Sequence, residues 1–440
     1  MKHKTILITG YFIALTLLGV RNIQAQDTTK NITLKEAIDL SIKNSKLLKE
    51  NKAKIDEATA AVKEANEKKL PDFSITGSYL FLPVTPNIDL KTNSSSGGST
   101  PKVSQAMYGI ANISLPVYTG GKLNYGIESA KYLEQATKLD ADHDKGNIII
   151  NTINAFSNLY KAKAAVELVK QNLVQSQQRV KDFSDLEKNG LLARNDLLKV
   201  ELQSSNVELA LLDAESNYKV ASVNLNLILG LPEQTLLLPD SASLIQATTV
   251  KNIDDYEQMA FQNRKDLNAI SVRKKAADIG VKSLKSDYYP NIAITGGYVA
   301  ADIPKFLTIT NAVDIGVGIQ YNLSSIWKTK TKIAEAQSRV QQLSANEEML
   351  DDEIRLQVNQ AYENYLVTQK KIEVYQKAVE QADENYRITK NKYDNALVST
   401  TDLLDADVAQ LQARLNEVNA TVDAVIAYNK LLQSAGILNN

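Results

Sequence analysis

The sequence predicts a mainly α-helical fold with a transmembrane β part, built from two copies of one structural repeat. Three patterns in the 440 residues predict this fold class. Two very long stretches place apolar residues at the spacing of a coiled coil. Four short segments alternate large apolar residues with small or polar ones, as strands with two different faces do. The second half of the chain also matches the first half in sequence.

The composition excludes several functional classes. The chain has no Cys, two His, and 50 Lys and Arg against 51 Asp and Glu. Without Cys there is no disulfide, thiolate nucleophile or Cys-bound zinc. So few histidines argue against a catalytic triad or a multi-His metal centre, and the weakly acidic balance gives no surface for nucleic acid. We therefore expect no enzyme, no cofactor or metal, and no nucleic-acid partner.

The first 25 residues predict a signal peptide. A basic head with Lys2 and Lys4 precedes an apolar run over residues 5–20, and Ala25 is a small residue suited to cleavage. An N-terminal membrane anchor is the alternative, and Arg21 and the polar residues after it argue against that. No later apolar run reaches the length that a membrane-spanning helix needs. The chain is therefore expected to be exported, and any membrane crossing would use strands.

The internal duplication has two ungapped registers. With an offset of 219 residues, Pro71 corresponds to Pro290, and with an offset of 206, Asp196 corresponds to Asp402. The offset changes before Lys122, in an interval that holds the low-complexity stretch 92–101 (TNSSSGGSTP), which predicts a surface loop or a plain connector. The predicted division of the chain is a first repeat over 26–230, a linker over 231–251 and a second repeat over 252–440.

The sequence of each repeat predicts the elements helix, strand, loop, strand, long helix, turn and helix, in this order. The expected long helices cover about 123–188 and 328–394, each roughly 100 Å in length at 1.5 Å per residue. Shorter helices are expected over about 34–70, 195–229, 254–289 and 401–434. The coiled-coil seam of the first long helix is predicted from residues three, four or seven apart: Leu159, Val166, Val169, Leu173, Val180 and Phe183.

The strands are expected in two pairs, at about 72–117 and 291–323. Their alternation predicts an outward apolar set with Tyr and Phe near the ends, as in outer-membrane strands. A soluble sheet packed on helices is the alternative, and the coiled-coil helices offer no broad face to cover one. Four strands cannot close a barrel, and an open sheet edge is not tolerated in lipid. Several chains must then close it together; three would give twelve strands, although the pattern does not fix that number.

Several motifs, in order, resemble the TolC family of outer-membrane efflux channels. They are the opening helix 31–45 (NITLKEAIDLSIKNS), the strand-to-helix junction 115–122 (LPVYTGGK), the end of the first half at 225–232 (LNLILGLP), and the hairpin tip 393–407 (YDNALVSTTDLLDAD). The resemblance covers almost the whole mature chain. Each motif alone is weak, but together, on a duplication behind a signal peptide, they are specific.

The resemblance implies a homotrimer, with a twelve-stranded β-barrel in the outer membrane and a hollow α-helical barrel in the periplasm. Segment 234–249 and the C-terminal segment would form a belt around its middle. Such a channel is the exit duct of a tripartite efflux or type I secretion system. Small molecules or polypeptide would pass through it, driven by an inner-membrane transporter (RND or ABC type) through a periplasmic adaptor protein. The alternative function is that adaptor itself, which would have one helical hairpin, not two.

The resemblance also implies a pore gate at the hairpin tip, where Asp402 and Asp405 match aspartates that ring the lumen. Three copies would bring six carboxylates to a narrow opening, which would attract cations. The alternative for Asp402 is helix capping, because Thr400-Thr401-Asp402 is a good capping sequence. A cap does not need Asp405 a turn further on, so gating is favoured for Asp405.

Two departures from the family affect this gate. The family's tip Gly is present as Gly190 but is Ala396 in the second half, and Val398 stands where well-studied members have an Arg that holds the gate closed. Arg194, Asp196 and Tyr393 are the candidates for a rewired gate lock. His143, within 140–144 (DADHD), suggests metal binding, but its polar helical surroundings favour a solvated face.

Overall fold

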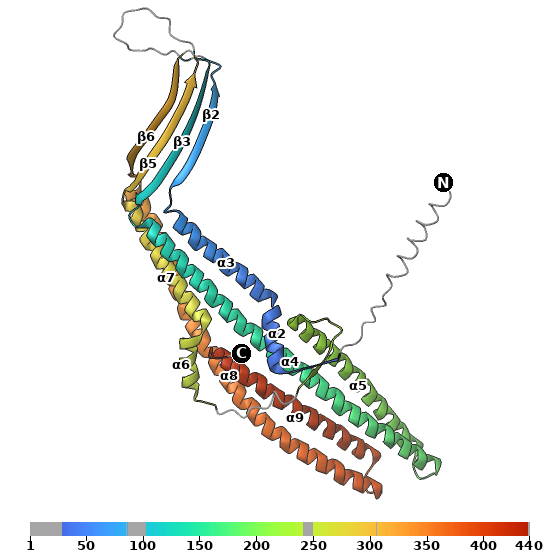
Figure 1. The fold of residues 1–440 in the computed structure, drawn as a ribbon. Coiled ribbons are helices and arrows are strands. Elements are labelled where there is room, and N and C mark those ends of the chain that lie inside the picture. Colours follow the sequence, from blue (N-terminus) through green and yellow to red (C-terminus); the bar gives the residue numbers. More distant parts are fainter. Residues whose placement is uncertain (1–28, 85, 87–102, 241–249, 305, 439–440) are drawn as a thin grey trace, which may run out of the picture.

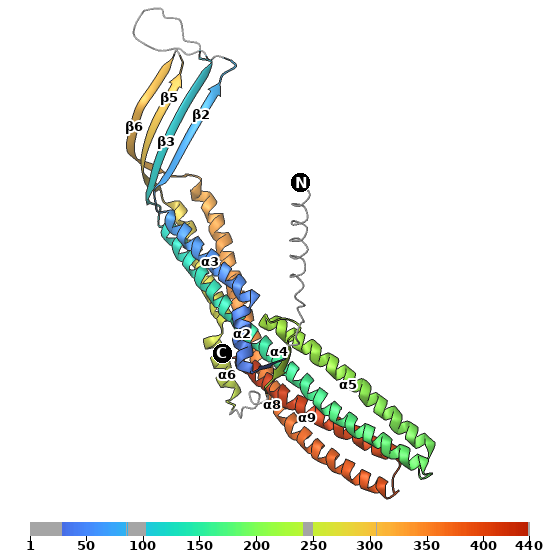
Figure 2. The same cartoon turned by 45° about the vertical axis from the view of Figure 1, so that its right-hand side comes forward.

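The computed structural model shows an elongated molecule with a β-sheet at one end and a helical bundle running away from it (Figures 1 and 2). The structure describes residues 29–84, 86, 103–240, 250–304 and 306–438. The predicted signal peptide and the loop 92–101 lie outside the described residues, as does part of the linker 231–251. Among the described residues, no helix is both long enough and apolar enough to cross a bilayer.

The elements follow the predicted order with three additions. The strands of the sheet are β2 (Asp72–Phe81), β3 (Gln105–Tyr118), β5 (Asn291–Ile303) and β6 (Leu307–Gln320). The helices are α2 (Leu34–Asn44), α3 (Lys46–Glu67), α4 (Lys122–Lys188), α5 (Arg194–Leu229), α6 (Ile253–Asn263), α7 (Lys265–Lys285), α8 (Ser325–Asp394) and α9 (Thr400–Ser434). The additions are the short strands β1 (Thr29–Ile32) and β4 (Leu236–Pro239), which pair in parallel, and a 3₁₀ turn, η2 (Ser286–Tyr288).

The four long strands form one antiparallel sheet in the order β2-β3-β5-β6. The register places Ser74 opposite Asn112, Asn112 opposite Gly297, and Gly297 opposite Asp314. Within the described residues, β2 and β6 each pair along one side only, so both edges of the sheet are open.

The two faces of this sheet differ in chemistry, as the alternation predicts. One face carries large apolar side chains that are strongly exposed in the single chain, with Phe73 at 74%, Ile75 at 88% and Ile315 at 85%. The opposite face carries Ser74, Asn112 and other small or polar residues. An exposed apolar face next to a polar one is the pattern of a barrel strand with lipid outside and water inside.

The helical body consists of two long hairpins, α4 with α5 and α8 with α9, whose tips lie at the end remote from the sheet (Figures 1 and 2). The 67 residues of α4 and the 70 of α8 confirm the two long coiled-coil helices. The turn between α4 and α5 places Gly190 at φ 72°, and the turn between α8 and α9 places Ala396 at φ 57°. Ala396 therefore adopts the left-handed conformation without the freedom of glycine, at a cost of roughly 1 kcal/mol.

Two predicted helices are broken where the sequence indicated continuity. The helix expected over 34–70 divides at Ser45, which leaves the helical conformation (ψ 124°) and accepts a hydrogen bond from Leu48 N at 3.2 Å. The helix expected over 254–289 divides at Arg264, with ψ 125°. Each break faces a left-handed glycine: Gly230 lies against Asn44, and Gly436 lies against the Arg264 backbone.

Candidate functional site

The two hairpin tips pack against each other through a small apolar core of Phe183, Leu197, Val200 and Leu403. Phe183 is on α4, Leu197 and Val200 are on α5, and Leu403 is on α9. Because both hairpins contribute to this core, the residues around it decide whether the tips stay together. The candidate gate residues all lie within a few turns of this core.

Asp402 occupies the third position of α9 in a capping box with Ser399. The Ser399 N–H donates to Asp402 Oδ2 at 2.9 Å, and the Asp402 N–H donates to Ser399 Oγ at 3.2 Å. Hydrogen bonds from the Ser399 side chain and backbone lower the pKa of Asp402, which keeps its exposed carboxylate charged. Asp402 therefore takes part in capping α9, although the N-cap residue is Ser399 and not a residue of 400–402. Its role in a pore gate stays a prediction. Asp405 is exposed one turn further along the same face of α9.

The three lock candidates are only partly brought together. Arg194 lies 3.8 Å from Glu187 and Asp196 lies 3.2 Å from Lys199, so both ion pairs stay within the first hairpin. Tyr393 does cross between the hairpins, because its ring stacks on Phe183 with centroids 5.4 Å apart. Burial, together with the nearby charges of Asp196 and Asp394, raises the pKa of Tyr393, so this phenol stays neutral.

A buried ion pair that the sequence interpretation missed also joins the hairpins. Arg179 on α4 donates two hydrogen bonds of 3.1 Å to the carboxylate of Asp407 on α9. Arg179 also donates to the Tyr386 hydroxyl on α8 at 3.2 Å, and Asn172 Nδ2 lies 3.4 Å from both Asp407 oxygens. Arg179 is 8% exposed and Asp407 is 1% exposed. Burial opposes the charge of Arg179, but pairing with Asp407 raises the pKa of Arg179 above its usual value.

Arg179 was missed in the sequence analysis because the buried seam of α4 follows a different set of residues near the tip. The buried residues step by three and four through Val169, Asn172, Ser176, Arg179 and Phe183. The predicted seam shares Leu159, Val169 and Phe183 with the observed one, but its other members, Val166, Leu173 and Val180, are only partly buried. Near the tip, the buried seam is therefore formed partly by polar residues. The apolar pattern instead predicted the residues next to them in sequence, such as Leu173 and Val180, as the seam.

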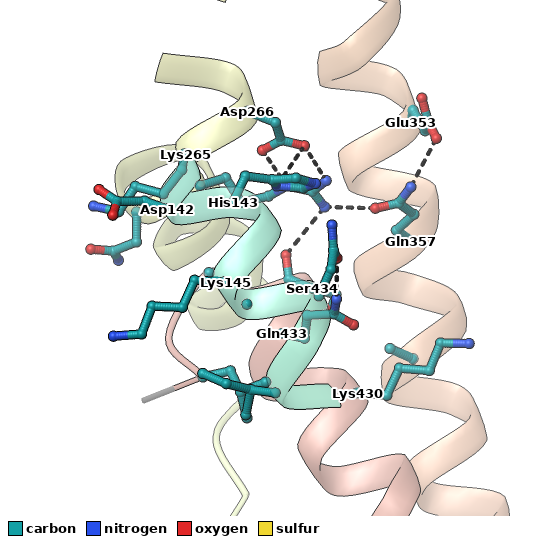
Figure 3. A pocket seen from close by; sticks show the side chains of 18 of the residues that line it. Asp142, His143, Lys145, Lys265, Asp266, Glu353, Gln357, Lys430, Gln433 and Ser434 are labelled. Atoms are coloured by element: carbon teal, nitrogen blue, oxygen red, sulfur yellow. Dashed lines mark hydrogen bonds and ion pairs between the residues drawn. The ribbon is translucent and has the colours of Figure 1, made fainter. Parts of the chain in front are cut away.

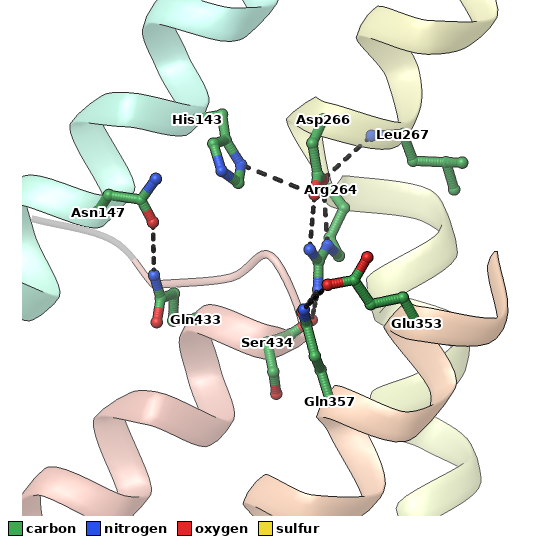
Figure 4. Close-up of polar contacts among 9 residues, drawn as sticks. All are labelled: His143, Asn147, Arg264, Asp266, Leu267, Glu353, Gln357, Gln433 and Ser434. Carbon is green, nitrogen blue, oxygen red and sulfur yellow. Dashed lines mark hydrogen bonds and ion pairs between the residues drawn. The ribbon is translucent and has the colours of Figure 1, made fainter. Parts of the chain in front are cut away.

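A second polar centre lies at mid-length, where α9 ends against the junction of α6 and α7. A cavity of about 1000 Å³ opens here between α4, α7, α8 and α9 (Figure 3). Arg264 is buried beside it, donates to Asp266 Oδ2 and to Gln357 Oε1 at 2.6 Å each, and contacts the Ser434 carbonyl at 3.5 Å (Figure 4). Arg264 therefore ties the end of α9 to α7 and α8.

His143 lies on α4 at the edge of this cavity, with Nδ1 3.9 Å from Asp266 Oδ2 (Figure 4). Burial alone would raise the pKa of Asp266, but the Arg264 guanidinium, the His143 ring and the Leu267 N–H together hold it below its ordinary value. His143 thus lies beside the Arg264–Asp266 pair, with its side chain 37% exposed. Over the ranges that the structure describes, no group of three or more His, Asp or Glu is placed to hold a metal ion.

Asp266→Asn is expected to lower the free energy of unfolding by about 1–3 kcal/mol at neutral pH, because Arg264 would remain buried without its carboxylate. Since the folded-state pKa of Asp266 is lowered, its stabilising contribution is complete above the ordinary pKa of 3.8 and is lost as the pH falls through the lower folded value. The difference in Tm between wild type and variant should therefore be constant from about pH 8 to 5 and narrow below about pH 4.

Thermal unfolding followed by circular dichroism measures this difference. Glu384→Gln is the control, because it removes only the exposed pair between Glu384 and Arg387. It should change Tm little at neutral pH. An equal loss of Tm in the two variants would contradict the importance of the Arg264–Asp266 pair.

Comparisons with known proteins agree with this architecture. The profile of the family "Outer membrane efflux protein" matches residues 37–231 and 257–437, which is most of the chain. The chain is 23% identical to the outer membrane efflux protein BepC of Brucella suis over 415 residues, covering 92% of this chain and 85% of that protein. It is 26% identical to the outer membrane protein TolC of Escherichia coli over 250 residues, covering 53% of this chain and 48% of that protein.

A solved structure shows the same fold over nearly the whole length. The outer membrane protein VceC of Vibrio cholerae superimposes with a TM-score of 0.74 at 19% identity, covering 92% of this chain and 96% of that one. The family profile matches one segment in each half of the chain, and these matches do not favour the periplasmic-adaptor alternative. The chain therefore belongs to the outer membrane efflux protein family, and it is a non-enzymatic efflux channel of the outer membrane with a periplasmic helical portion.

Proposed function

We propose that three copies of the chain form one continuous efflux duct, with a twelve-stranded barrel in the outer membrane and a helical tube below it. The observation that supports this most directly is the open sheet, whose edge strands β2 and β6 have no partner on their outer sides among the described residues. In lipid these edges must be paired, and β2 of one copy against β6 of the next would pair them. Three four-stranded sheets exceed the eight strands of the smallest outer-membrane barrels.

Two unpartnered apolar stripes on the helices support the same assembly. In the part of the helical body that holds the two hairpins, α5 packs on α4, α4 packs on α9, and α9 packs on α8. The outer helices of this row are therefore α5 and α8. The stripe on α5 consists of the exposed residues Leu198, Leu202, Leu209, Leu212, Val220 and Leu227. The stripe on α8 consists of the exposed residues Met349, Leu356, Val367, Val374 and Ile388. We expect the α5 stripe of one copy to pack on the α8 stripe of the next, as coiled-coil helices do.

The partners follow from this arrangement. Members of the family work with partner proteins in efflux systems. We propose a periplasmic adaptor protein and an inner-membrane transporter, of RND or ABC type, as the partners of this chain. The substrates would be small molecules such as drugs or toxic compounds, or a polypeptide, and outer-membrane lipid would surround the barrel.

The gate of this duct is proposed to be the pair of carboxylate rings formed by Asp402 and Asp405 at the tip of α9. Both side chains are exposed in the single chain, and residues three apart lie on one face of a helix. Asp402 is also tied to Ser399, so its ring would be fixed in position, whereas Asp405 follows it further from the turn. Six carboxylates in a narrow opening would concentrate cations and bind divalent ions.

The gate lock is proposed to consist of contacts between the two hairpins. Arg179, Asp407 and Tyr386 supply its polar part, and the stacking of Tyr393 on Phe183 supplies its apolar part. Arg194 and Asp196 stay predictions for this lock, because their ion pairs lie within the first hairpin.

Single-channel conductance in a planar bilayer tests the duct and its gate. The wild type should give small, cation-selective openings that Mg²⁺ blocks. Asp405→Ala should weaken this block by about tenfold, which corresponds to a loss of about 1.4 kcal/mol in ion binding. Asp402→Ala should weaken the block as well, and should also destabilise the start of α9 through loss of the capping box.

Glu417→Ala, which removes an acidic residue from the middle of α9, is the matched control and should leave the block unchanged. A conducting wild type with unaltered block in Asp405→Ala would retain the duct and reject Asp405 as its gate. A protein that stays soluble and does not conduct would reject the duct.

A further inference from the structure

The junction between the sheet and the helices has an unusual order of side chains along α8. The exposed apolar residues of β6 continue past Ile319 to Tyr321, and the next exposed large apolar side chains are Leu323, Ile326 and Trp327. Leu323 lies in the turn just before α8, and Ile326 and Trp327 lie in its first turn, so the three exposed side chains cluster where the strand passes into the helix. Lys330 follows four residues after Ile326 and three after Trp327, which places it on the same face of α8 as these two.

Apolar side chains followed by Trp and then by Lys are arranged as the layers at the surface of a membrane, where hydrocarbon is followed by headgroups and then by water. Lys330 and Lys332 lie about 4–8 Å beyond Trp327 along the helix axis, at 1.5 Å per residue. The headgroup region of one leaflet is of similar depth, roughly 5–8 Å. Trp side chains are enriched where hydrocarbon meets headgroups, and Lys side chains extend from there toward the water.

Exposed lysines gather at this level of the molecule. Six of them, Lys68 and Lys69 after α3, Lys285 at the end of α7, and Lys328, Lys330 and Lys332 on α8, are here called the lysine collar. Lys122 at the start of α4 is also exposed at this level, but it pairs with Asp287 at 2.7 Å. Lys68 pairs with Glu64 at 3.1 Å. The other five lysines of the collar have no ion pair to any residue that the structure describes. Since α3 and α8 lie on opposite sides of the α4–α7 pair, α3 of a neighbouring copy would bring Lys68 and Lys69 close to α8.

The collar is not an ordinary solvated helix face. Further along α8, charges are compensated within the helix, as in Lys370 with Glu373 and Arg387 with Glu384. The first ten residues of α8, 325–334, hold three Lys and no acid. Positive charges at a helix N-terminus also repel the positive end of the helix dipole. Uncompensated charge at the unfavourable end of a helix indicates an anionic partner from outside the chain.

We propose that the lysine collar binds the headgroups of anionic phospholipid in the periplasmic leaflet of the outer membrane. This inference rests on the proposed function, because the strands must lie in the membrane for the collar to meet its surface. The partner is a lipid surface because the collar directly follows the lipid-facing stripe of Leu323, Ile326 and Trp327. Ammonium groups attract phosphate headgroups as point charges without a shaped pocket.

Trp327 is the only tryptophan of the chain, so its fluorescence reports on the collar directly. The full-length mature protein is reconstituted into phosphatidylcholine vesicles that contain either brominated phosphatidylglycerol or brominated phosphatidylcholine, and quenching of Trp327 is measured. We expect brominated phosphatidylglycerol to quench more strongly at equal mole fraction, corresponding to about threefold tighter binding. This preference should fall as the salt concentration rises.

The variant Lys328→Gln/Lys330→Gln/Lys332→Gln should quench equally with both lipids. Lys371→Gln/Lys377→Gln/Lys390→Gln makes the same change in charge far along α8 and should keep the preference. Equal quenching in the wild type, in protein that still conducts, would overturn the collar and leave the channel intact. No quenching by either lipid, in protein that does not conduct, would overturn both the collar and the proposed membrane position.

Discussion

Arg179→Ala is expected to lower the free energy of unfolding by about 3–5 kcal/mol and to raise the resting conductance of the channel. The variant leaves the Asp407 carboxylate, 1% exposed, without its cationic partner in the seam between α4 and α9. An unpaired charge at such a site has lost its hydration and gains nothing in return. Because the pair joins the two hairpins near their tips, its loss also removes a contact that holds the tips together.

Denaturant unfolding and planar-bilayer conductance measure the two effects separately. Arg387→Ala is the matched control, because it removes an Arg from α8 that pairs with Glu384 at 2.7 Å on the exposed surface. That change should leave the free energy of unfolding almost unchanged, because exposed ion pairs contribute little. Equal stability of Arg179→Ala and Arg387→Ala would show that the buried pair contributes no more than a surface pair.

A double variant separates fold stability from gating. Arg179→Leu/Asp407→Leu removes both charges and replaces them with apolar volume, which is often neutral or stabilising for a buried pair. We expect this protein to be as stable as the wild type within about 1–2 kcal/mol, yet to conduct more at rest. A stable double variant with the conductance of the wild type would exclude the ion pair from the lock.

The periodic parts of this fold could be predicted from sequence because each period fixes one kind of element. Seven-residue spacing indicated α4 and α8, and two-residue spacing indicated β2, β3, β5 and β6 and the residues that form their apolar face. The breaks at Ser45 and Arg264 could not be found this way, since neither residue ends a helix by itself. At each joint a glycine that is distant in sequence, Gly230 or Gly436, also packs closely against the chain.

The candidate site was less predictable, because its contacts join residues that differ between the repeats. The register aligns Ser45 with Arg264, and the two positions break their helices by different chemistry: a hydroxyl cap in one and a buried pair with Asp266 in the other. Arg179 is separated from Asp407 by 228 residues, and its own repeat counterpart is Asn385. Local sequence shows that Asp402 can cap a helix, but no local pattern pairs Arg179 with Asp407.

Ile315→Lys is expected to prevent assembly of the barrel in the membrane, whereas Gly316→Lys should be tolerated. The two positions are neighbours in β6 but point to opposite faces of the sheet, because side chains alternate along a strand. Ile315 lies on the apolar face and is 85% exposed in the single chain, so its replacement would place an ammonium group in lipid. Lysine on the lipid face of a barrel costs about 2–4 kcal/mol near the bilayer midplane, and a trimer would contain it three times.

At Gly316 the same side chain would enter the water-filled side of the sheet. The nearest atom to an added Cβ there is Thr295 Oγ1 at 4.0 Å, so a side chain fits without displacing its neighbours. The measurement is the amount of heat-resistant trimer recovered from the outer-membrane fraction, together with conductance after reconstitution. Both variants introduce one lysine and the same charge into the same strand, but on opposite faces of the sheet. Equal recovery would mean that the face bearing Phe73, Ile75 and Ile315 does not contact lipid, and the barrel would then have to be oriented differently or not be formed at all.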